Sequence, residues 1–151
     1  MDQGCLTGSP FFIYIRAKKL KPSFLSYLPA IAWFITSFIL LTLPGSDIPQ
    51  YDFLDKIYFD KWVHIGMFSI LVILFSLPLK KIRPAGSRVF LVILLAAWGY
   101  GIAMEFVQKY YIPLRSFDIA DIIADGVGCL LGFYFTRYLL HREAIKKQTG
   151  R

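Results

Sequence analysis

The amino-acid sequence predicts an all-α protein, a bundle of four transmembrane helices with both termini in the cytoplasm. Three observations support this prediction. The chain has 151 residues, of which 56% are hydrophobic, a composition that excludes a disordered chain. Its apolar residues fall into four long segments. Its basic residues lie on alternate connections between those segments, as they do in membrane proteins with cytoplasmic Lys and Arg.

Each apolar segment is long enough to cross a membrane. The first has twenty residues without a charge, which as a helix at about 1.5 Å per residue spans a hydrocarbon core of roughly 30 Å. The second contains one His, the third continues helically to Gln108, and the fourth carries two Asp near its start and Arg137 near its end. The four predicted spans are Phe24–Leu43, Trp62–Leu79, Val89–Met104 and Ile119–Leu140. We therefore divide the chain into a basic tail (1–23), a membrane domain (24–140) and a second basic tail (141–151).

The net charge of +7 is the sum of two opposite contributions. The termini and the connection between the second and third spans together carry +11, whereas the opposite side carries −4. The positive-inside rule places the basic side, and with it both termini, in the cytoplasm. Because the basic residues flank membrane spans, we reject nucleic acid as a partner and expect membrane lipids instead.

The outer end of the second span begins with Asp60, Lys61 and His64. Asp60 and His64 are four residues apart and therefore share a helix face. An interfacial His that is hydrogen-bonded to a neighbour would account for this pattern without a functional site. A His that exchanges protons would also account for it, because the unperturbed pKa of imidazole lies near 6.5.

The outer end of the third span carries Glu105 and Gln108 on one face, with Gly101 a turn below. A carboxylate is disfavoured at a helix C-terminus and is costly near the hydrocarbon region. The ordinary interpretation is a surface ion pair with Lys109. The alternative is a site that requires a carboxylate there.

The fourth span begins after Arg115 and carries three Asp on one stripe, at positions 118, 121 and 125. Helix capping explains Asp118 and partly Asp121. It does not explain Asp125, which lies about 10 Å deeper and must face protein or water. Gly128 and Gly132 continue the stripe and indicate close helix packing. Under the predicted topology all these residues share one depth band, which favours a polar pocket at the outer leaflet.

These motifs together resemble the VanZ-like family of integral membrane proteins. The resemblance rests on Asp60-Lys61-x-x-His64, on Glu105-x-x-Gln108, and on Arg115-Ser-x-Asp118-x-x-Asp121-x-x-x-Asp125 with its spaced glycines. The family commonly has Asn where this chain has Asp125. The resemblance implies a multi-pass protein of the bacterial cytoplasmic (inner) membrane, in a family associated with glycopeptide resistance. It also implies action on a lipid head group or a polyprenol-linked cell-wall precursor.

We therefore expect a membrane-embedded enzyme with an outward-facing site. His64 would be the base or nucleophile, and Glu105 or Asp121 would orient or protonate. Arg115 and Lys61 would hold a phosphate. Further substrate-binding candidates are Gln108, Asp118 and Asp125, with Asp60, Gly128 and Gly132 as structural support. A divalent cation such as Mg²⁺ could bridge the carboxylates, but one His and several acids do not specify a metal.

Two other functions fit the same residues. The pocket could bind a lipid head group or a glycopeptide without turnover. The chain could instead be a small transporter, which needs a polar route through both leaflets. The inner halves of the second and third spans supply only Ser69, Ser76 and small residues for such a route. The oligomeric state does not follow from the sequence.

Overall fold

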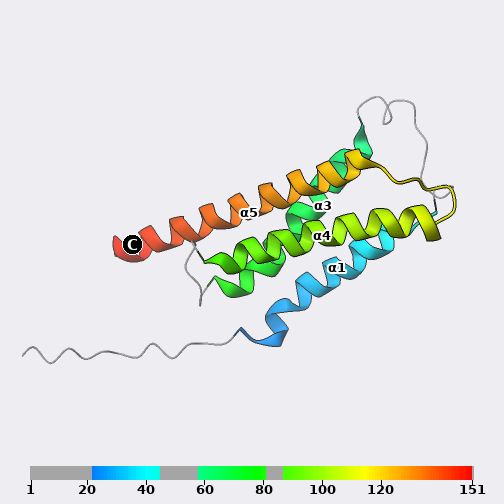
Figure 1. The fold of residues 1–151 in the computed structure, drawn as a ribbon. Coiled ribbons are helices and arrows are strands. Elements are labelled where there is room, and N and C mark those ends of the chain that lie inside the picture. Colours follow the sequence, from blue (N-terminus) through cyan, green and yellow to red (C-terminus); the bar gives the residue numbers. More distant parts are fainter. Residues whose placement is uncertain (1–21, 45–57, 81–86, 151) are drawn as a thin grey trace, which may run out of the picture.

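The structure, a computed structural model, describes residues 22–44, 58–80 and 87–150. These residues are helical apart from short connections, and four of their helices are long and apolar enough to span a membrane. The predicted all-α, four-helix architecture is therefore confirmed (Figure 1). Most of the N-terminal tail and Lys81 and Arg83 of the basic connection lie outside the described residues.

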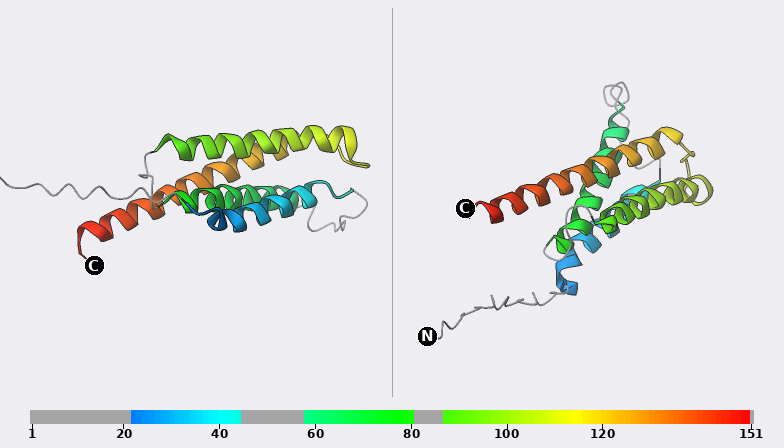
Figure 2. Two further views of the ribbon diagram at one scale, coloured as in Figure 1. Left: turned by 90° about the horizontal axis from the view of Figure 1, so that it is seen from below. Right: turned by 60° about the vertical axis from the view of Figure 1, so that its left-hand side comes forward.

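The observed helices match the predicted spans closely. A 3₁₀ turn η1 (Phe24–Tyr27) leads into α1 (Leu28–Leu41), and the 3₁₀ turn η3 (Leu77–Leu79) follows directly on α3. The longer helices are α3 (Phe59–Ser76), α4 (Arg88–Tyr111) and α5 (Ile119–Gln148). Helix α5 thus runs beyond Leu140 into the segment predicted as a basic tail, and its last turns project past the other helices (Figures 1 and 2).

Local chemistry sets the end of α4 and the start of α5. Helix α4 ends at Tyr111 because the following residue, Ile112, precedes Pro113 and adopts an extended conformation. Helix α5 begins after Asp118, whose Oδ1 accepts a hydrogen bond of 2.8 Å from the backbone N–H of Ala120. This is an N-cap, which satisfies one of the unpaired amides of the first turn.

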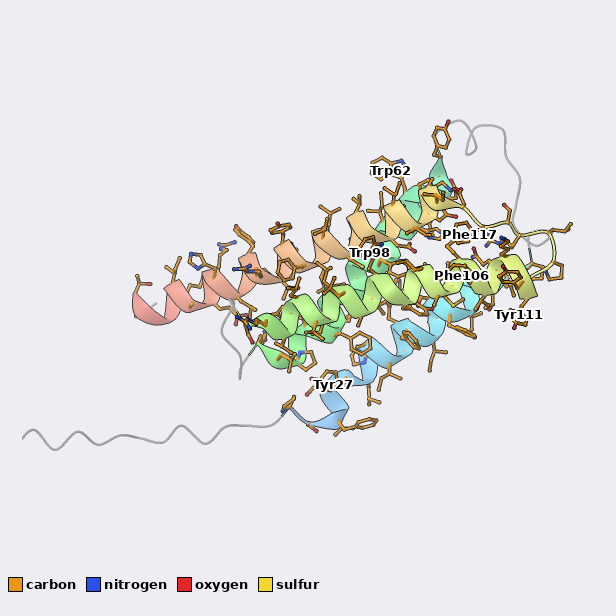
Figure 3. The ribbon with its side chains drawn as sticks, viewed as in Figure 1. Tyr27, Trp62, Trp98, Phe106, Tyr111 and Phe117 are labelled. Carbon is orange, nitrogen blue, oxygen red and sulfur yellow. The ribbon has the colours of Figure 1, made fainter. Side chains whose placement is uncertain are left out.

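The helices alternate in direction, so that the starts of α1 and α4 and the ends of α3 and α5 lie at one end of the bundle (Figure 1). The described chain therefore begins and finishes at the same end. The opposite end gathers exposed aromatic side chains, among them Trp62 and Tyr111 (Figure 3). Aromatic side chains of this kind are enriched at membrane interfaces.

Helix α3 is the centre of the bundle and makes its most extensive contact with α5. The two helices cross closely because Gly128 and Gly132 bring the α5 backbone against α3. A Cβ atom on either glycine would lie 2.5 Å from a backbone oxygen of α3, that of Ile65 or Ser69. Ser69 Oγ also donates a hydrogen bond of 2.8 Å to the carbonyl oxygen of Gly128. The core on both sides of this crossing is apolar and includes Met67, Phe68, Leu71, Val72, Leu94, Ala97, Met104 and Cys129.

Candidate functional site

A cluster of charged and polar side chains lies where the start of α3, the end of α4 and the start of α5 meet. We call it the polar cluster and define it as Lys61, His64, Glu105, Asp118, Asp121 and Asp125. Three helices contribute to it, because its members come from the start of α3, the end of α4 and the start of α5. The shared depth band predicted from the charges thus corresponds to a set of residues linked by short contacts.

His64 and Asp125 form the deepest contact of the cluster. His64 Nδ1 lies 2.8 Å from Asp125 Oδ1, and both side chains are buried. With Asp125 ionised, its carboxylate only accepts hydrogen bonds, and Nδ1 would carry the proton in this contact. The second ring nitrogen, Nε2, lies 4.0 Å from Asp121 Oδ2. The contact with Asp125 orients the imidazole, and an ionised Asp125 would also set its tautomer.

Asp125 is confined from its other side by helix α4. A Cβ atom placed on Gly101 would overlap Asp125 Oδ2 and lie 3.1 Å from Asp125 Cβ, so glycine leaves room for the carboxylate in its present position. The sequence pattern placed Gly101 a turn below Glu105 but did not assign it to the site. A residue pattern shows which helix face a glycine occupies, whereas its partner depends on how the helices are rotated against each other.

Lys61 is surrounded by aspartates. Its ammonium lies 2.5 Å from Asp118 Oδ2, 2.5 Å from Asp121 Oδ1 and 2.9 Å from Asp60 Oδ2. The hydrogen bond from Lys61 is the main cause that holds the pKa of Asp118 below its ordinary value, and the Ala120 amide acts in the same direction. Asp118 and Asp60 are partly exposed, whereas Asp121 is buried. Lys61 thus links the start of α3 to the start of α5.

Glu105, near the end of α4, contacts the connection between α4 and α5. Its side chain is only 1% exposed, and Oε2 accepts a hydrogen bond of 2.9 Å from the backbone N–H of Asp118. The alternative of a surface pair with Lys109 is not what the structure shows. Lys109 Nζ instead lies 5.3 Å from the ring centre of Tyr110 and 5.8 Å from that of Phe117.

Gln108 and Arg115 contact the C-terminal end of α1 rather than the polar cluster. Gln108 Nε2 donates a hydrogen bond of 2.9 Å to the carbonyl oxygen of Leu41, and Arg115 Nε donates one of 3.4 Å to that of Leu43. Both carbonyls belong to the last turn of α1 or follow it, where backbone acceptors have no partner within the helix. These two contacts could not be predicted from residue types, because the acceptors are backbone atoms.

The space between the carboxylates of Asp118 and Asp121, where the sequence allowed a bridging cation, is taken by a lysine. Among the described residues, no three His, Cys, Asp or Glu side chains are grouped as ligands of one metal ion. The Lys61 ammonium occupies the position between Asp118 and Asp121 where a bridging cation would lie. The residues present therefore do not fit a cation between these two carboxylates.

The fold and the cluster define the class of protein, a small multi-pass membrane protein with polar residues gathered at one end of its helices. Comparison with protein families identifies it further. The VanZ/LLP1 family model matches residues 14–141, most of the chain, and the protein belongs to this family. Comparison with curated proteins and with solved structures finds no match. The family suspected from the three motifs is confirmed.

Proposed function

We propose that the protein is a membrane-embedded enzyme acting on a lipid head group, or on a polyprenol-linked cell-envelope precursor, at the outer leaflet of a bacterial cytoplasmic membrane. The observation that carries this proposal is the buried contact of 2.8 Å between His64 Nδ1 and Asp125 Oδ1. Burying a His–carboxylate pair inside a membrane span is costly, so a chain that keeps one has a use for it.

The geometry supports a general-base role for His64. Asp125 holds the proton on Nδ1, which leaves Nε2 as the nitrogen able to accept one. Nε2 would take the proton of a water molecule or substrate hydroxyl, and the oxygen would attack the head-group linkage. The bond to the leaving group then breaks, and the leaving group receives the proton back from His64. General acid–base catalysis of this kind contributes about 10²–10⁴-fold to a rate.

The remaining members of the cluster would position His64 and receive the substrate. Asp121 Oδ2, 4.0 Å from Nε2, would stabilise the imidazolium that forms during proton transfer. Lys61 holds Asp121 in place through its contact of 2.5 Å with Oδ1. Because three carboxylates already contact the Lys61 ammonium, a phosphate would have to displace one of them to bind there.

The experiment that tests the proposal is turnover of labelled lipid by the purified full-length chain. The protein is reconstituted in vesicles made from a radiolabelled bacterial lipid extract, and products are separated by chromatography and mass spectrometry. We expect His64→Ala to lower product formation by about 100-fold or more. The matched control is His141→Ala, because His141 is the second His of the chain and is exposed on α5, away from the cluster.

A second pair of variants separates a positioning role of Asp125 from a structural one. Asp125→Ala removes the acceptor for Nδ1 and should reduce turnover about as much as loss of His64. Asp125→Asn keeps an acceptor oxygen of the same shape and should recover part of the activity. Lipid that binds without any product in the unmodified protein would instead indicate a binding protein, and full activity in His64→Ala would refute the proposed base.

A further inference from the structure

An apolar groove opens between α1, α3 and α4, on the inner side of the polar cluster. It has a volume of about 180 Å³. Ala96 and Ala97 of α4 leave this space open, because their short side chains do not fill the gap between the surrounding aromatic residues. The groove is lined by Phe34, Leu71, Phe75, Ile93, Ala96, Ala97 and Tyr100. Its one polar group is the Tyr100 hydroxyl, which lies 3.4 Å from Ser37 Oγ.

The groove opens within the membrane-spanning part of the molecule. All of its lining residues belong to helices that are long and apolar enough to cross a bilayer. Phe34 is 38% exposed, and Ala96 is exposed as well, so the groove is accessible from the surface of the bundle. The medium at this depth is lipid hydrocarbon, which excludes a polar ligand and favours an aliphatic one.

The depth of the groove relates it to the polar cluster. On α4, Tyr100 precedes Glu105 by five residues and Ile93 precedes it by twelve. At about 1.5 Å per residue, the groove extends from about 7 Å to about 18 Å inward of Glu105. The hydrocarbon chain of a lipid whose head group lies at the outer end of the bundle occupies this depth.

We infer that the groove is a binding site for one hydrocarbon chain of a membrane lipid. Its occupant is an acyl or prenyl chain rather than a helix of another protein, because the groove is apolar and its volume of about 180 Å³ is too small for a helix about 10 Å across. This inference goes beyond the proposed function and does not require the chemistry assigned to His64. In an enzyme with the proposed function, the groove would select substrates with long hydrocarbon chains over soluble head-group compounds.

The test is residue-resolved photolabelling of the full-length chain. The protein is reconstituted in phosphatidylethanolamine vesicles containing phosphatidylglycerol with a diazirine in the middle of one acyl chain. Labelled positions are mapped by mass spectrometry. Besides the label that bulk lipid places on Leu91 and Leu95, which lie exposed on the same helix, we expect label on the groove residues Ile93 and Ala97, although Ala97 is only 8% exposed.

Two variants with matched added bulk on α4 complete the test. Ala97→Phe fills the groove and should lower its labelling several-fold, whereas Leu95→Phe adds a ring on the exposed face and should not. Ala96→Leu serves as the second groove-filling variant if Ala97→Phe does not accumulate. Absence of label on Ile93 and Ala97, or unchanged groove labelling in the filled variants, would overturn the inference. Crosslinks from the groove to a second copy of the chain would also overturn it.

Discussion

At the residue scale, the site depends on how one carboxylate is held. Asp125 touches His64 through one oxygen, while the other faces a glycine that has no side chain to displace it. A buried carboxylate that is hydrogen-bonded and sterically confined has few other positions available. His64 is therefore oriented by its environment, and in the proposed reaction this would lower the reorganisation that proton transfer requires.

Gly101→Ala tests this confinement directly. The added methyl group would overlap Asp125 Oδ2, so the carboxylate must move and its contact with His64 must lengthen or break. We expect turnover in the lipid assay to fall by up to about 100-fold, since misplacement of a catalytic group by about 1 Å can cost that much. The control is Gly99→Ala on the same helix, where an added Cβ meets no atom within 4 Å. Equal activity of the two variants would show that Asp125 is not held by this contact.

At the scale of the helix, two sets of contacts hold α5 against α3. The glycines at positions 128 and 132 allow close approach at mid-helix, and the aspartates around Lys61 tie the two helix starts together. The glycine contact is within the membrane-spanning part, where van der Waals packing rather than hydrophobic burial drives helix association. The lysine contact is near the surface and depends on charge.

Gly128→Ala should weaken the α3–α5 crossing. The new Cβ would lie 2.5 Å from the carbonyl oxygen of Ile65 and 3.0 Å from its Cα, so the helices must separate. Overpacking of this kind costs about 1–3 kcal/mol, and the thermal unfolding midpoint in a mild detergent should fall accordingly. Gly66→Ala on α3 is the matched control, because no atom lies within 4 Å of its added Cβ. A drop of the same size in both variants would contradict a specific contact at Gly128.

Asp118 should give the protein a stability that depends on pH. Contact with Lys61 holds the pKa of Asp118 below its ordinary value of 3.8, so the ionised form stabilises the folded state. That contribution is complete above pH 3.8 and is lost as the pH falls through the lowered pKa of the folded protein. Asp118→Asn keeps an N-cap but removes the charge.

The measurement is the unfolding midpoint of both proteins in a nonionic detergent at pH 6 and at pH 3. The unmodified protein should lose more stability than Asp118→Asn between these two conditions. Asp118→Ala, which removes the cap as well, should be less stable than Asp118→Asn at pH 6 by about 1 kcal/mol. Identical losses in the unmodified protein and in Asp118→Asn would show that the ion pair with Lys61 contributes nothing.

The sequence predicted the helices better than it predicted their contacts. All four spans could be predicted because an apolar segment of this length with so few charged residues is rare outside a membrane helix. The membrane span predicted from the sequence ends at Leu140. The helix itself continues through charged turns to Gln148, because a helix outside the membrane can carry charged residues. The predicted topology of the four spans was enough to place the polar residues in one depth band. The pairing of His64 with Asp125, and of Gln108 with the Leu41 carbonyl, follows from helix rotation and backbone position, which residue patterns do not encode.

At the scale of the whole molecule, the alternation of helix direction separates two different ends. One end bears the polar cluster with Trp62 and Tyr111 beside it, and the other bears the described chain ends and the basic last turns of α5 (Figures 1 and 3). The asymmetry of the charges predicts which end faces the cytoplasm. If that prediction is right, the cluster lies on the side where cell-envelope precursors are used.

Reporter fusions test this orientation. Alkaline phosphatase needs disulfides and is therefore active only outside the cytoplasm. We expect a fusion after Ile112, in the connection between α4 and α5, to be active, and a fusion after Gln148 to be inactive. A green fluorescent protein at the C-terminus should fluoresce. The opposite pattern would place the polar cluster on the cytoplasmic side and would exclude a substrate in the outer leaflet.

The contact between Gly101 and Asp125 also bears on how the family can vary. The two positions lie on different helices, but the carboxylate of Asp125 occupies the space that a side chain at position 101 would need. Aspartate and asparagine have nearly the same volume, so relatives with asparagine at this position should still require glycine at the position of Gly101. A relative with alanine or serine there should carry a smaller residue in place of Asp125. An alignment of relatives would then show these two positions changing together. In a relative with a smaller residue in place of Asp125, the histidine at the position of His64 would lack its buried partner.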